Sequence, residues 1–232
     1  MKKKIKILDC TLRDGGYYTN WNFKKNIVDK YLLALTEANI DAIELGYRFI
    51  GQKDSIGAYA KLEESFIKTL KIKKGLKKYI MINSAEFLEN NNIKLKAIEK
   101  NFKNQNTSLI DGIRIAVNIN EYKYSKKLSN ILSSMGYKIC LNLMQASNKK
   151  NDYYKKIVSN ISSWSSIDVL YFADSFGNMY PKDVENITKI FKKNFNKEVG
   201  AHLHNNKGFG LINSIYAANA GIDWIDSTIL GM

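Results

Sequence analysis

Short apolar runs alternate with longer polar segments along the chain, at the spacing expected of repeated β–α units. The runs are rich in β-branched and aromatic residues, which is typical of buried strands. Their first residues lie 25–38 positions apart. The pattern predicts eight strands, at Ile5–Cys10, Asp41–Gly46, Tyr79–Asn83, Gly112–Asn118, Lys138–Met144, Val169–Ala173, Val199–His204 and Trp224–Leu230.

The segments between these runs have helical spacing. In Lys24–Ala38, apolar side chains recur with a period of about 3.6, at Ile27, Val28, Tyr31, Leu32 and Leu35. Pro181 stands directly before another such segment, where the first turn of a helix tolerates proline. The predicted helices are Lys24–Ala38, Lys61–Leu70, Ile93–Phe102, Ser125–Met135, Tyr153–Trp164, Lys182–Phe195 and Phe209–Ala220.

Strands that alternate with helices predict an α/β fold with a parallel sheet covered by helices. Eight such units are the number that closes a (β/α)₈ TIM barrel, and we predict one catalytic domain over residues 1–232. An open, doubly wound sheet is the alternative. That fold usually carries a G-x-G-x-x-G turn after its first strand, whereas the turn here reads Asp14-Gly-Gly-Tyr17.

The predicted barrel lacks its last helix, because the sequence stops at Gly231-Met232 directly after the eighth run. Without that helix, the last strand would expose an apolar face, which favours contact with another chain. We therefore expect a truncated or split gene product, or a second copy or partner chain that covers the last strand.

Composition excludes some function classes. The formal net charge is +14, but only three of the 36 basic residues are arginines, and the lysines are spread along the chain. Nucleic-acid-binding surfaces usually concentrate arginine and aromatic residues, so we expect no nucleic-acid partner. The basic N-terminus precedes no apolar stretch of a signal peptide, and no run is long enough to span a membrane. Cys10 and Cys140 lie in apolar runs, which predicts buried free thiols and a cytoplasmic location.

The two histidines of the chain, His202 and His204, are two positions apart at the end of the seventh predicted strand. Side chains at this spacing point the same way, about 6.5–7 Å apart along a strand. Two imidazoles placed so can bind one metal ion, although two polar residues near a strand end are the plainer interpretation. Asp14 or Asp9 could add a carboxylate. This donor set suits Mn²⁺, Mg²⁺, Co²⁺ or Zn²⁺ as a Lewis acid for a carbonyl oxygen.

All three arginines, Arg13, Arg48 and Arg114, lie on or just after predicted strands. The carboxyl ends of the strands form the active-site face of such barrels. A guanidinium binds a carboxylate through two parallel hydrogen bonds and stabilises an enolate, which lysine does less well. For Arg114, pairing with a neighbouring acid inside the barrel is an equally good interpretation.

Four segments resemble the metal-dependent aldolase and acyltransferase barrels, the HMG-CoA lyase-like or DRE-TIM metallolyase superfamily. They are Asp9-Cys-Thr-Leu-Arg-Asp-Gly-Gly16, Ala173-Asp-Ser175, Ala201-His-Leu-His-Asn-Asn206 and Asp226-Ser-Thr-Ile-Leu-Gly-Met232. The superfamily includes 3-hydroxy-3-methylglutaryl-CoA lyase, isopropylmalate synthase and 4-hydroxy-2-oxovalerate aldolase. The chain is most similar to the last of these, from the first strand to the eighth.

The resemblance implies that Asp14, His202 and His204 bind the metal and that Arg13 steadies an enolate. It also places Asp174 near the substrate, at the end of the sixth strand.

Other positions depart from the family pattern. Tyr17 stands where the aldolase carries a histidine base, and a tyrosine with a pKa of about 10 is a weak base, so its catalytic role is expected to be proton or hydrogen-bond donation. Arg48 and Arg114 are candidates for binding the substrate carboxylate. The family's asparagine metal ligand would follow the eighth strand, beyond Met232.

These residues predict a divalent-metal-dependent carbon–carbon lyase that acts on a 4-hydroxy-2-oxo acid through a metal-bound pyruvate enolate. Mn²⁺ is the ion we expect. The alternatives are a Claisen-type enzyme that condenses an acyl-CoA with a 2-oxo acid, and a non-catalytic barrel that depends on a partner.

Overall fold

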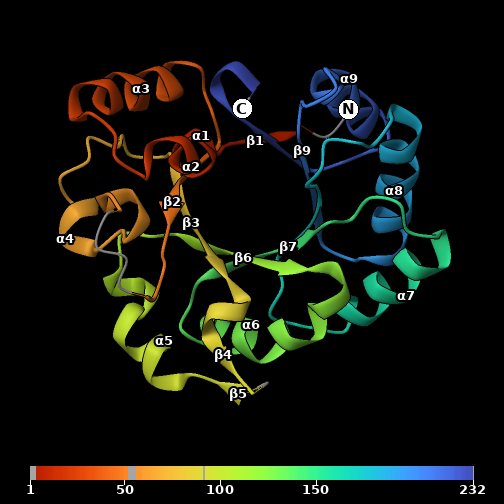
Figure 1. Cartoon of the computed structure of the whole chain (residues 1–232), viewed down its shortest axis with the longest axis horizontal. Helices are drawn as coiled ribbons and strands as arrows, with labels where there is room; N and C mark the ends of the chain where they lie inside the picture. The colour runs from red at the N-terminus through yellow and green to blue at the C-terminus, as the bar shows by residue number, and fades with distance from the viewer. Residues whose placement is uncertain (1–3, 52–55, 91, 232) are drawn as a thin grey trace.

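Eight parallel strands close into a barrel in the order β1-β10-β9-β8-β7-β6-β3-β2 (Figure 1). The computed structural model describes residues 4–51, 56–90 and 92–231; the ends of the predicted domain, residues 1–3 and Met232, lie outside them. The barrel strands are β1 (Lys6–Asp9), β2 (Ala42–Tyr47), β3 (Lys77–Asn83), β6 (Gly112–Asn118), β7 (Lys138–Met144), β8 (Val169–Asp174), β9 (Glu198–Leu203) and β10 (Trp224–Ser227). Because β1 pairs with both β2 and β10, the sheet has no edge, which confirms the TIM barrel over the open sheet.

Helices surround the barrel and cover its strands (Figure 1). They are α3 (Lys25–Glu37), α4 (Glu64–Ile67), α5 (Leu95–Asn101), α6 (Ser125–Ser134), α7 (Asn151–Ser162), α8 (Pro181–Asn194) and α9 (Gly210–Asn219). The predicted apolar positions of α3 pack inward except for one: Ile27 is 59% exposed, whereas the buried positions are Val28, Tyr31, Leu32 and Leu35. Pro181 is the first residue of α8, as predicted, and the side chain of Asp183 accepts the backbone N–H of Tyr180 there.

Two predicted elements are shorter than the sequence pattern indicated. The helix predicted at Lys61–Leu70 is reduced to α4, because Leu62 has a positive φ of 47° that breaks the helical path. The strand predicted at Trp224–Leu230 ends at Ser227, since the backbone N–H of Ile229 turns away to Thr11 Oγ1. A 3₁₀ helix, η5 (Ile229–Gly231), follows, and no α-helix follows β10 within the described residues.

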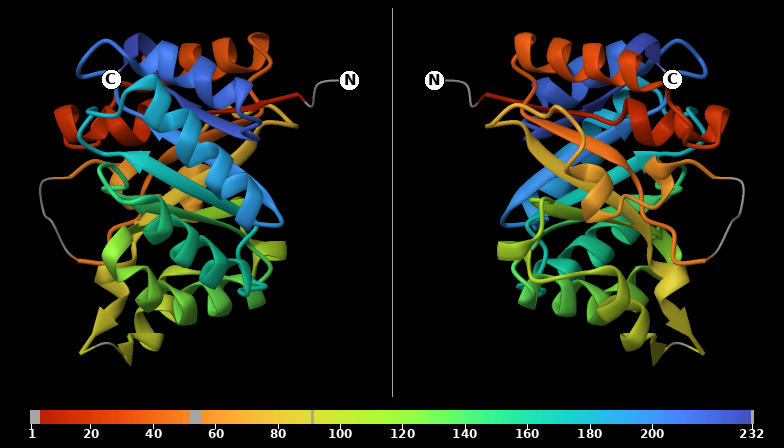
Figure 2. Two further views of the ribbon diagram at one scale, coloured as in Figure 1. Left: turned by 90° about the vertical axis from the view of Figure 1, so that its right-hand side faces the viewer. Right: turned by 90° about the vertical axis from the view of Figure 1, so that its left-hand side faces the viewer.

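Several short elements escaped the periodicity analysis. Two one-turn helices, α1 (Thr11–Asp14) and α2 (Gly16–Thr19), follow β1 directly. A small antiparallel hairpin of β4 (Leu88–Glu89) and β5 (Asn92–Ile93) projects from the molecule in the side views (Figure 2). Short 3₁₀ helices complete the connections: η1 (Ala58–Ala60), η2 (Ser84–Phe87), η3 (Gln105–Thr107) and η4 (Ile119–Tyr124).

Inward-facing side chains fill the barrel in layers. The lower layer is apolar and includes Tyr79, Tyr171 and Trp224. Gly200 makes room for it, because a Cβ there would lie 2.3 Å from the ring of Tyr171. This apolar layer closes the barrel beneath the cavity that opens at the carboxyl ends of the strands.

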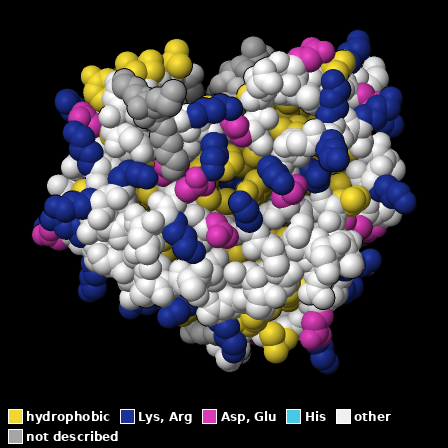
Figure 3. Space-filling model, turned by 180° about the vertical axis from the view of Figure 1, so that it is seen from behind, with side chains coloured by type: hydrophobic (Ala, Val, Ile, Leu, Met, Phe, Trp, Pro, Cys, Tyr) yellow, Lys and Arg dark blue, Asp and Glu magenta, His cyan; other side chains and the backbone are white. Residues whose placement is uncertain are grey.

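The opposite face of the barrel is a mosaic of opposite charges around an apolar centre (Figure 3). Lys4 pairs with Asp41 across 3.1 Å, and Lys77 pairs with Asp111 across 3.2 Å. The basic charge on this face is thus partly neutralised in place. No described helix is both long and apolar enough to cross a membrane.

Candidate active site

A cavity of about 510 Å³ opens at the carboxyl ends of the barrel strands. Its lining comes from three places. These are the turn after β1, the inward positions of β3, β6, β7, β8 and β9, and the segments that follow β8, β9 and β10. The lining residues are Arg13, Asp14, Tyr17, Tyr18, Met81, Ala116, Asn142, Met144, Ala173, Ser175, His202, His204, Asn205, Asn206 and Gly231. Segments far apart in the sequence therefore meet at one mouth, as the strand order requires.

The short helix α1 brings Arg13 and Asp14 into the barrel mouth, where both are buried. The guanidinium of Arg13 donates to Asp14 through Nη1, and to Glu44 on β2 through Nε at 2.8 Å. Nη2 of Arg13 makes no such contact among the described residues, and because Arg13 lines the cavity, this nitrogen can donate to a ligand there. Glu44 is fully buried, so it fixes the arginine from below.

His202 on β9 faces Asp14 across the mouth. Its Nδ1 lies 2.8 Å from Oδ2 of Asp226 on β10, and its Nε2 lies 3.8 Å from Oδ2 of Asp14. Asp226 also accepts a hydrogen bond from Nη2 of Arg114 at 2.5 Å.

These contacts close a ring of alternating charge. Arg114 on β6 donates to Asp226 and also, at 3.1 Å, to the same Glu44 oxygen that Arg13 contacts. The ring therefore runs from Asp14 through Arg13, Glu44, Arg114, Asp226 and His202 back to Asp14. Paired in this way, charges that would be costly to bury alone form a rigid floor for the cavity.

The electrostatics of the ring favour the ionised forms of Asp14 and Asp226. Burial alone would raise the pKa of the Asp14 carboxyl, but Arg13 and His202 outweigh burial and lower it. Burial opposes ionisation of Asp226 as well, and Arg114 and His202 lower its pKa. Both carboxylates are therefore ionised at neutral pH. An ionised Asp226 can only accept, so Nδ1 of His202 donates the hydrogen bond, and Nε2 is the ring nitrogen that faces Asp14.

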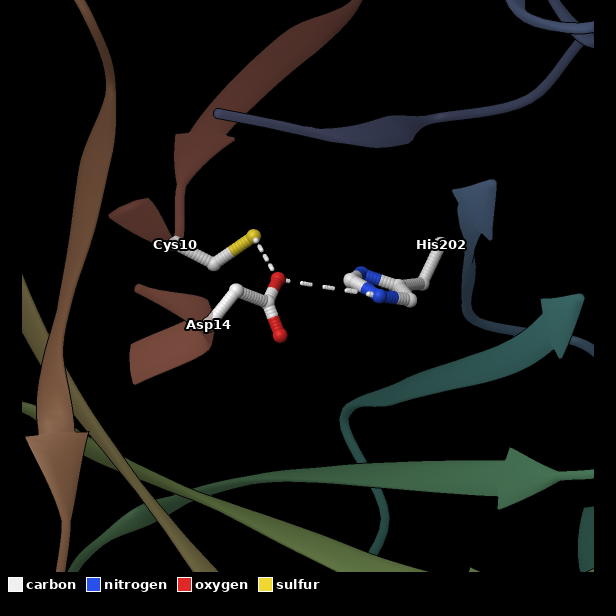
Figure 4. A group of neighbouring side chains, drawn as sticks. All are labelled: Cys10, Asp14 and His202. Atoms are coloured by element: carbon white, nitrogen blue, oxygen red, sulfur yellow. Dashed lines mark hydrogen bonds and ion pairs between the residues drawn. The ribbon is translucent and has the colours of Figure 1, made fainter. Parts of the chain in front are cut away.

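Cys10, Asp14 and His202 form a group whose ligand atoms lie within 4.8 Å of one another and can hold a metal ion (Figure 4). The thiol of Cys10 donates to Oδ2 of Asp14 at 3.2 Å. Burial, together with the charge of Asp14, raises the pKa of this thiol well above its usual value. Cys10 therefore stays protonated, which leaves the carboxylate of Asp14 and the imidazole of His202 as the better metal-binding groups of the three.

His204, the second predicted metal histidine, also lines the cavity, with its ring centre 4.9 Å from that of His202. It is not a member of the three-residue group that the described residues form. Burial and the neighbouring His202 lower the pKa of His204, so its imidazole is neutral near pH 7.

Known proteins are similar to this chain in sequence and in fold. A family model described as HMGL-like matches residues 4–232. The chain belongs to the HMGL-like family. It is 26% identical over 243 residues to the 4-hydroxy-2-oxovalerate aldolase of Geobacillus genomosp. 3, covering 100% of this chain and 66% of that protein. The chain thus spans about two-thirds of the length of this curated relative.

Two solved structures are similar to this HMGL-like barrel. The N-terminal domain of a candidate aldolase from Bacteroides vulgatus is 39% identical, with a TM-score of 0.83 over 98% of this chain and 74% of that one. The HMG-CoA lyase of Bacillus subtilis shares the fold, with a TM-score of 0.74 at 15% identity, over 97% of this chain and 77% of that one.

The structure of this HMGL-like chain separates the predicted site residues into two groups. Arg13, Asp14, Tyr17, His202 and His204 all line the cavity. Tyr17 lies at its rim with 61% of its surface exposed, and desolvation there raises the pKa of its phenol.

The remaining candidates lie elsewhere. Arg114 is buried beneath the cavity in the charged ring, which favours the interpretation that it pairs with acids. Asp174 points away from the barrel axis and accepts the backbone N–H groups of Asn178 and Met179. Asp9, the alternative metal carboxylate, accepts the hydroxyl of Tyr31 on α3.

Arg48 does not reach the cavity. Its guanidinium donates to the backbone oxygens of Asn101 and Leu62, outside the barrel. A register shift between Glu44 and Tyr47 explains this position, because it interrupts the alternation that would otherwise place Arg48 on the inner face with Glu44.

Sequence reasoning assigned no role in the site to three of its residues: Cys10, Glu44 and Asp226. Cys10 and Asp14 are four positions apart, which places them together once the turn of α1 is known. Glu44 and Asp226 stand two positions beyond inward-facing Ala42 and Trp224, so alternation on β2 and β10 was a signal that they face inward.

Proposed function

We propose that this protein is a divalent-metal-dependent carbon–carbon lyase that cleaves a 4-hydroxy-2-oxo acid into pyruvate and an aldehyde. The observation that carries this proposal is the convergence of Asp14, Nε2 of His202 and Arg13 on one cavity. A metal site beside a guanidinium suits a substrate that carries a carboxylate next to a carbonyl. The similarity to 4-hydroxy-2-oxovalerate aldolases supports the same reaction class.

Asp14 and His202 would hold the ion, with His204 beside them as the third protein ligand. Asp226 prepares His202 to bind the metal. Its hydrogen bond with Nδ1 orients the imidazole ring so that Nε2 would face the ion. Carboxylate and imidazole donors suit Mn²⁺, the ion we propose. When bound, the ion supplies a Lewis acid for the 2-oxo group.

The protein's own groups would handle the remaining charges. In cleavage the C3–C4 bond breaks, its electron pair moves towards the 2-oxo oxygen, and the 4-hydroxyl loses its proton as the aldehyde forms. C3 of the resulting enolate then takes up a proton to give pyruvate. Arg13 is held by Asp14 and Glu44 so that its free Nη2 can stabilise the negative charge that develops on oxygen. Tyr17 has a raised pKa and stays protonated, so it donates a hydrogen bond, and another acceptor takes the proton of the 4-hydroxyl.

The test is release of pyruvate from 4-hydroxy-2-oxo acids of several chain lengths by the Mn²⁺-loaded protein. We expect activity that a chelator removes and that added Mn²⁺ restores. His202→Ala is the inactive control. Silence with every chain length contradicts the proposal, and thiol release that depends on an acyl-CoA and a 2-oxo acid would identify the condensing reaction instead.

We further propose a cytoplasmic setting. Cys10 and Cys140 are both buried free thiols, which suits a reducing compartment. The related Bacteroides vulgatus structure is an N-terminal domain, which supports a further domain or partner chain beside the barrel.

A further inference from the structure

The cavity has a second half that the proposed reaction centre does not use. Met81, Ala116, Met144 and Ala173 line it, one from each of β3, β6, β7 and β8. These strands are consecutive neighbours in the barrel. They form a continuous apolar wall across the mouth from the turn after β1 that carries Arg13 and Asp14.

The size of the cavity exceeds what a small substrate fills. Its volume of about 510 Å³ falls within the range of about 300–1,000 Å³ found for sites that hold drug-sized ligands. Two aromatic side chains at the rim extend the apolar surface: Tyr17 is 61% exposed and Tyr18 is 80% exposed. Exposed aromatic side chains beside a cavity are typical of contacts to an apolar ligand.

A buried amide lies within this half. Asn142 on β7 is only 3% exposed, lines the cavity and is paired in register with Ala116. Its Oδ1 has no hydrogen-bond partner among the described residues. Because Asn142 lines the cavity among apolar side chains, its amide is a polar group that a ligand in this half would meet.

We propose that this protein acts on 4-hydroxy-2-oxo acids whose aldehyde-derived half carries a bulky apolar group such as a phenyl ring. The inference rests on the proposed lyase function and specifies its substrate class. The apolar group packs on Met81 and Met144, under Tyr17 and Tyr18. The amide of Asn142 turns its Nδ2 to the C4 oxygen, which accepts a hydrogen bond both as hydroxyl and as aldehyde.

Ligand binding tests the apolar wall independently of turnover. The probes are 4-phenyl-2-oxobutanoate and 2-oxobutanoate, which lack the 4-hydroxyl and cannot be cleaved, titrated by calorimetry into the Mn²⁺-loaded protein. We expect the phenyl compound to bind at least about tenfold more tightly, since its ring leaves water for an apolar surface.

Met144→Gln keeps the length of the side chain and makes the wall polar, so it should lower this ratio about fivefold or more. Met135→Gln is the matched control, because Met135 caps α6 outside the barrel, and it should leave the ratio unchanged. Equal affinity of the two probes for the wild-type protein overturns the proposal, whatever the lyase assay shows.

Turnover tests Asn142. Wild type should cleave 4-hydroxy-4-phenyl-2-oxobutanoate with a higher kcat/KM than 4-hydroxy-2-oxopentanoate. Asn142→Leu should lower kcat/KM about tenfold or more for both substrates, yet leave the affinity for 4-phenyl-2-oxobutanoate unchanged, because that probe has no C4 oxygen. A matching loss of affinity for this probe overturns the role of Asn142. If neither substrate is cleaved, the lyase proposal fails, and the binding ratio alone decides the preference for apolar groups.

Discussion

Asp226 accepts a hydrogen bond from Nδ1 of His202 across 2.8 Å, and this contact directs Nε2 of His202 towards Asp14. The carboxylate is buried and ionised, and the same oxygen, Oδ2, also accepts a hydrogen bond from Arg114. A carboxylate that orients a metal-binding imidazole makes the imidazole a better ligand and keeps it in one tautomer. The geometry of the proposed metal centre therefore depends on a residue that does not line the main cavity.

Asp226→Asn should weaken Mn²⁺ binding by about 10–100-fold, the usual effect of removing a partner of a metal-bound histidine. Competition titration with a fluorescent metal indicator measures this change. Asp152→Asn is the matched control, because the Asp152 side chain is 92% exposed on α7. Equal metal affinity of Asp226→Asn and wild type would rule out the orienting role.

Arg114→Leu should destabilise the protein by about 3–5 kcal/mol, since it leaves Glu44 and Asp226 buried without a counter-charge. Urea unfolding at neutral pH gives the free energy of unfolding. The comparison variant is Lys155→Leu, which breaks an exposed ion pair with Asp152 and should cost less than about 1 kcal/mol. Similar losses for the two variants would mean that the charged ring does not stabilise the fold.

The stability contributed by Asp226 should depend on pH in a defined direction. Its pKa in the folded protein lies below the unfolded value of about 3.9, because Arg114 and His202 outweigh burial. The contribution is therefore complete above about pH 4 and disappears as the pH falls through the folded pKa. In urea unfolding, the difference between wild type and Asp226→Asn should be constant from pH 7 to pH 5 and shrink towards pH 3. A difference that grows on acidification contradicts this assignment.

Tyr17→Phe should reduce pyruvate release by about tenfold or less, because the phenol serves as a donor with a raised pKa. A tyrosine that acted as the base would cost about 10²–10⁴-fold on removal. Steady-state kinetics from pH 6 to pH 10 separate the two roles. We expect the variant to keep the shape of the wild-type pH profile; loss of a basic limb would show that Tyr17 titrates in the reaction.

The sequence alone predicted the barrel well, because its signal repeats. Gly112–Asn118 and Lys138–Met144 match β6 and β7 to the residue, and every predicted barrel strand is present. Short elements such as α1 were missed since four residues are too few to show a period. This omission hid the proximity of Cys10 to Asp14.

Inner and outer positions were harder to predict than strands. Asp174 stands one position after inward-facing Ala173 and three positions after inward-facing Tyr171. Both steps are odd, so alternation places Asp174 outside, as its contacts with Asn178 and Met179 show. The position of Arg48 outside the barrel could be predicted only from the register shift in β2, which no local sequence pattern indicated. The charged ring could not be predicted before the barrel was known to close, because Arg114 and Asp226 are 112 positions apart in the sequence.

The most direct test of the account is the metal content of purified protein after equilibration with micromolar Mn²⁺ and removal of free ion. We predict about one ion per chain in wild type and in Asp152→Asn, and almost none in His202→Ala or Asp14→Asn. Circular dichroism should confirm that the variants remain folded. Equal metal content in wild type and His202→Ala would contradict the central claim that Asp14 and His202 share a cation at the barrel mouth.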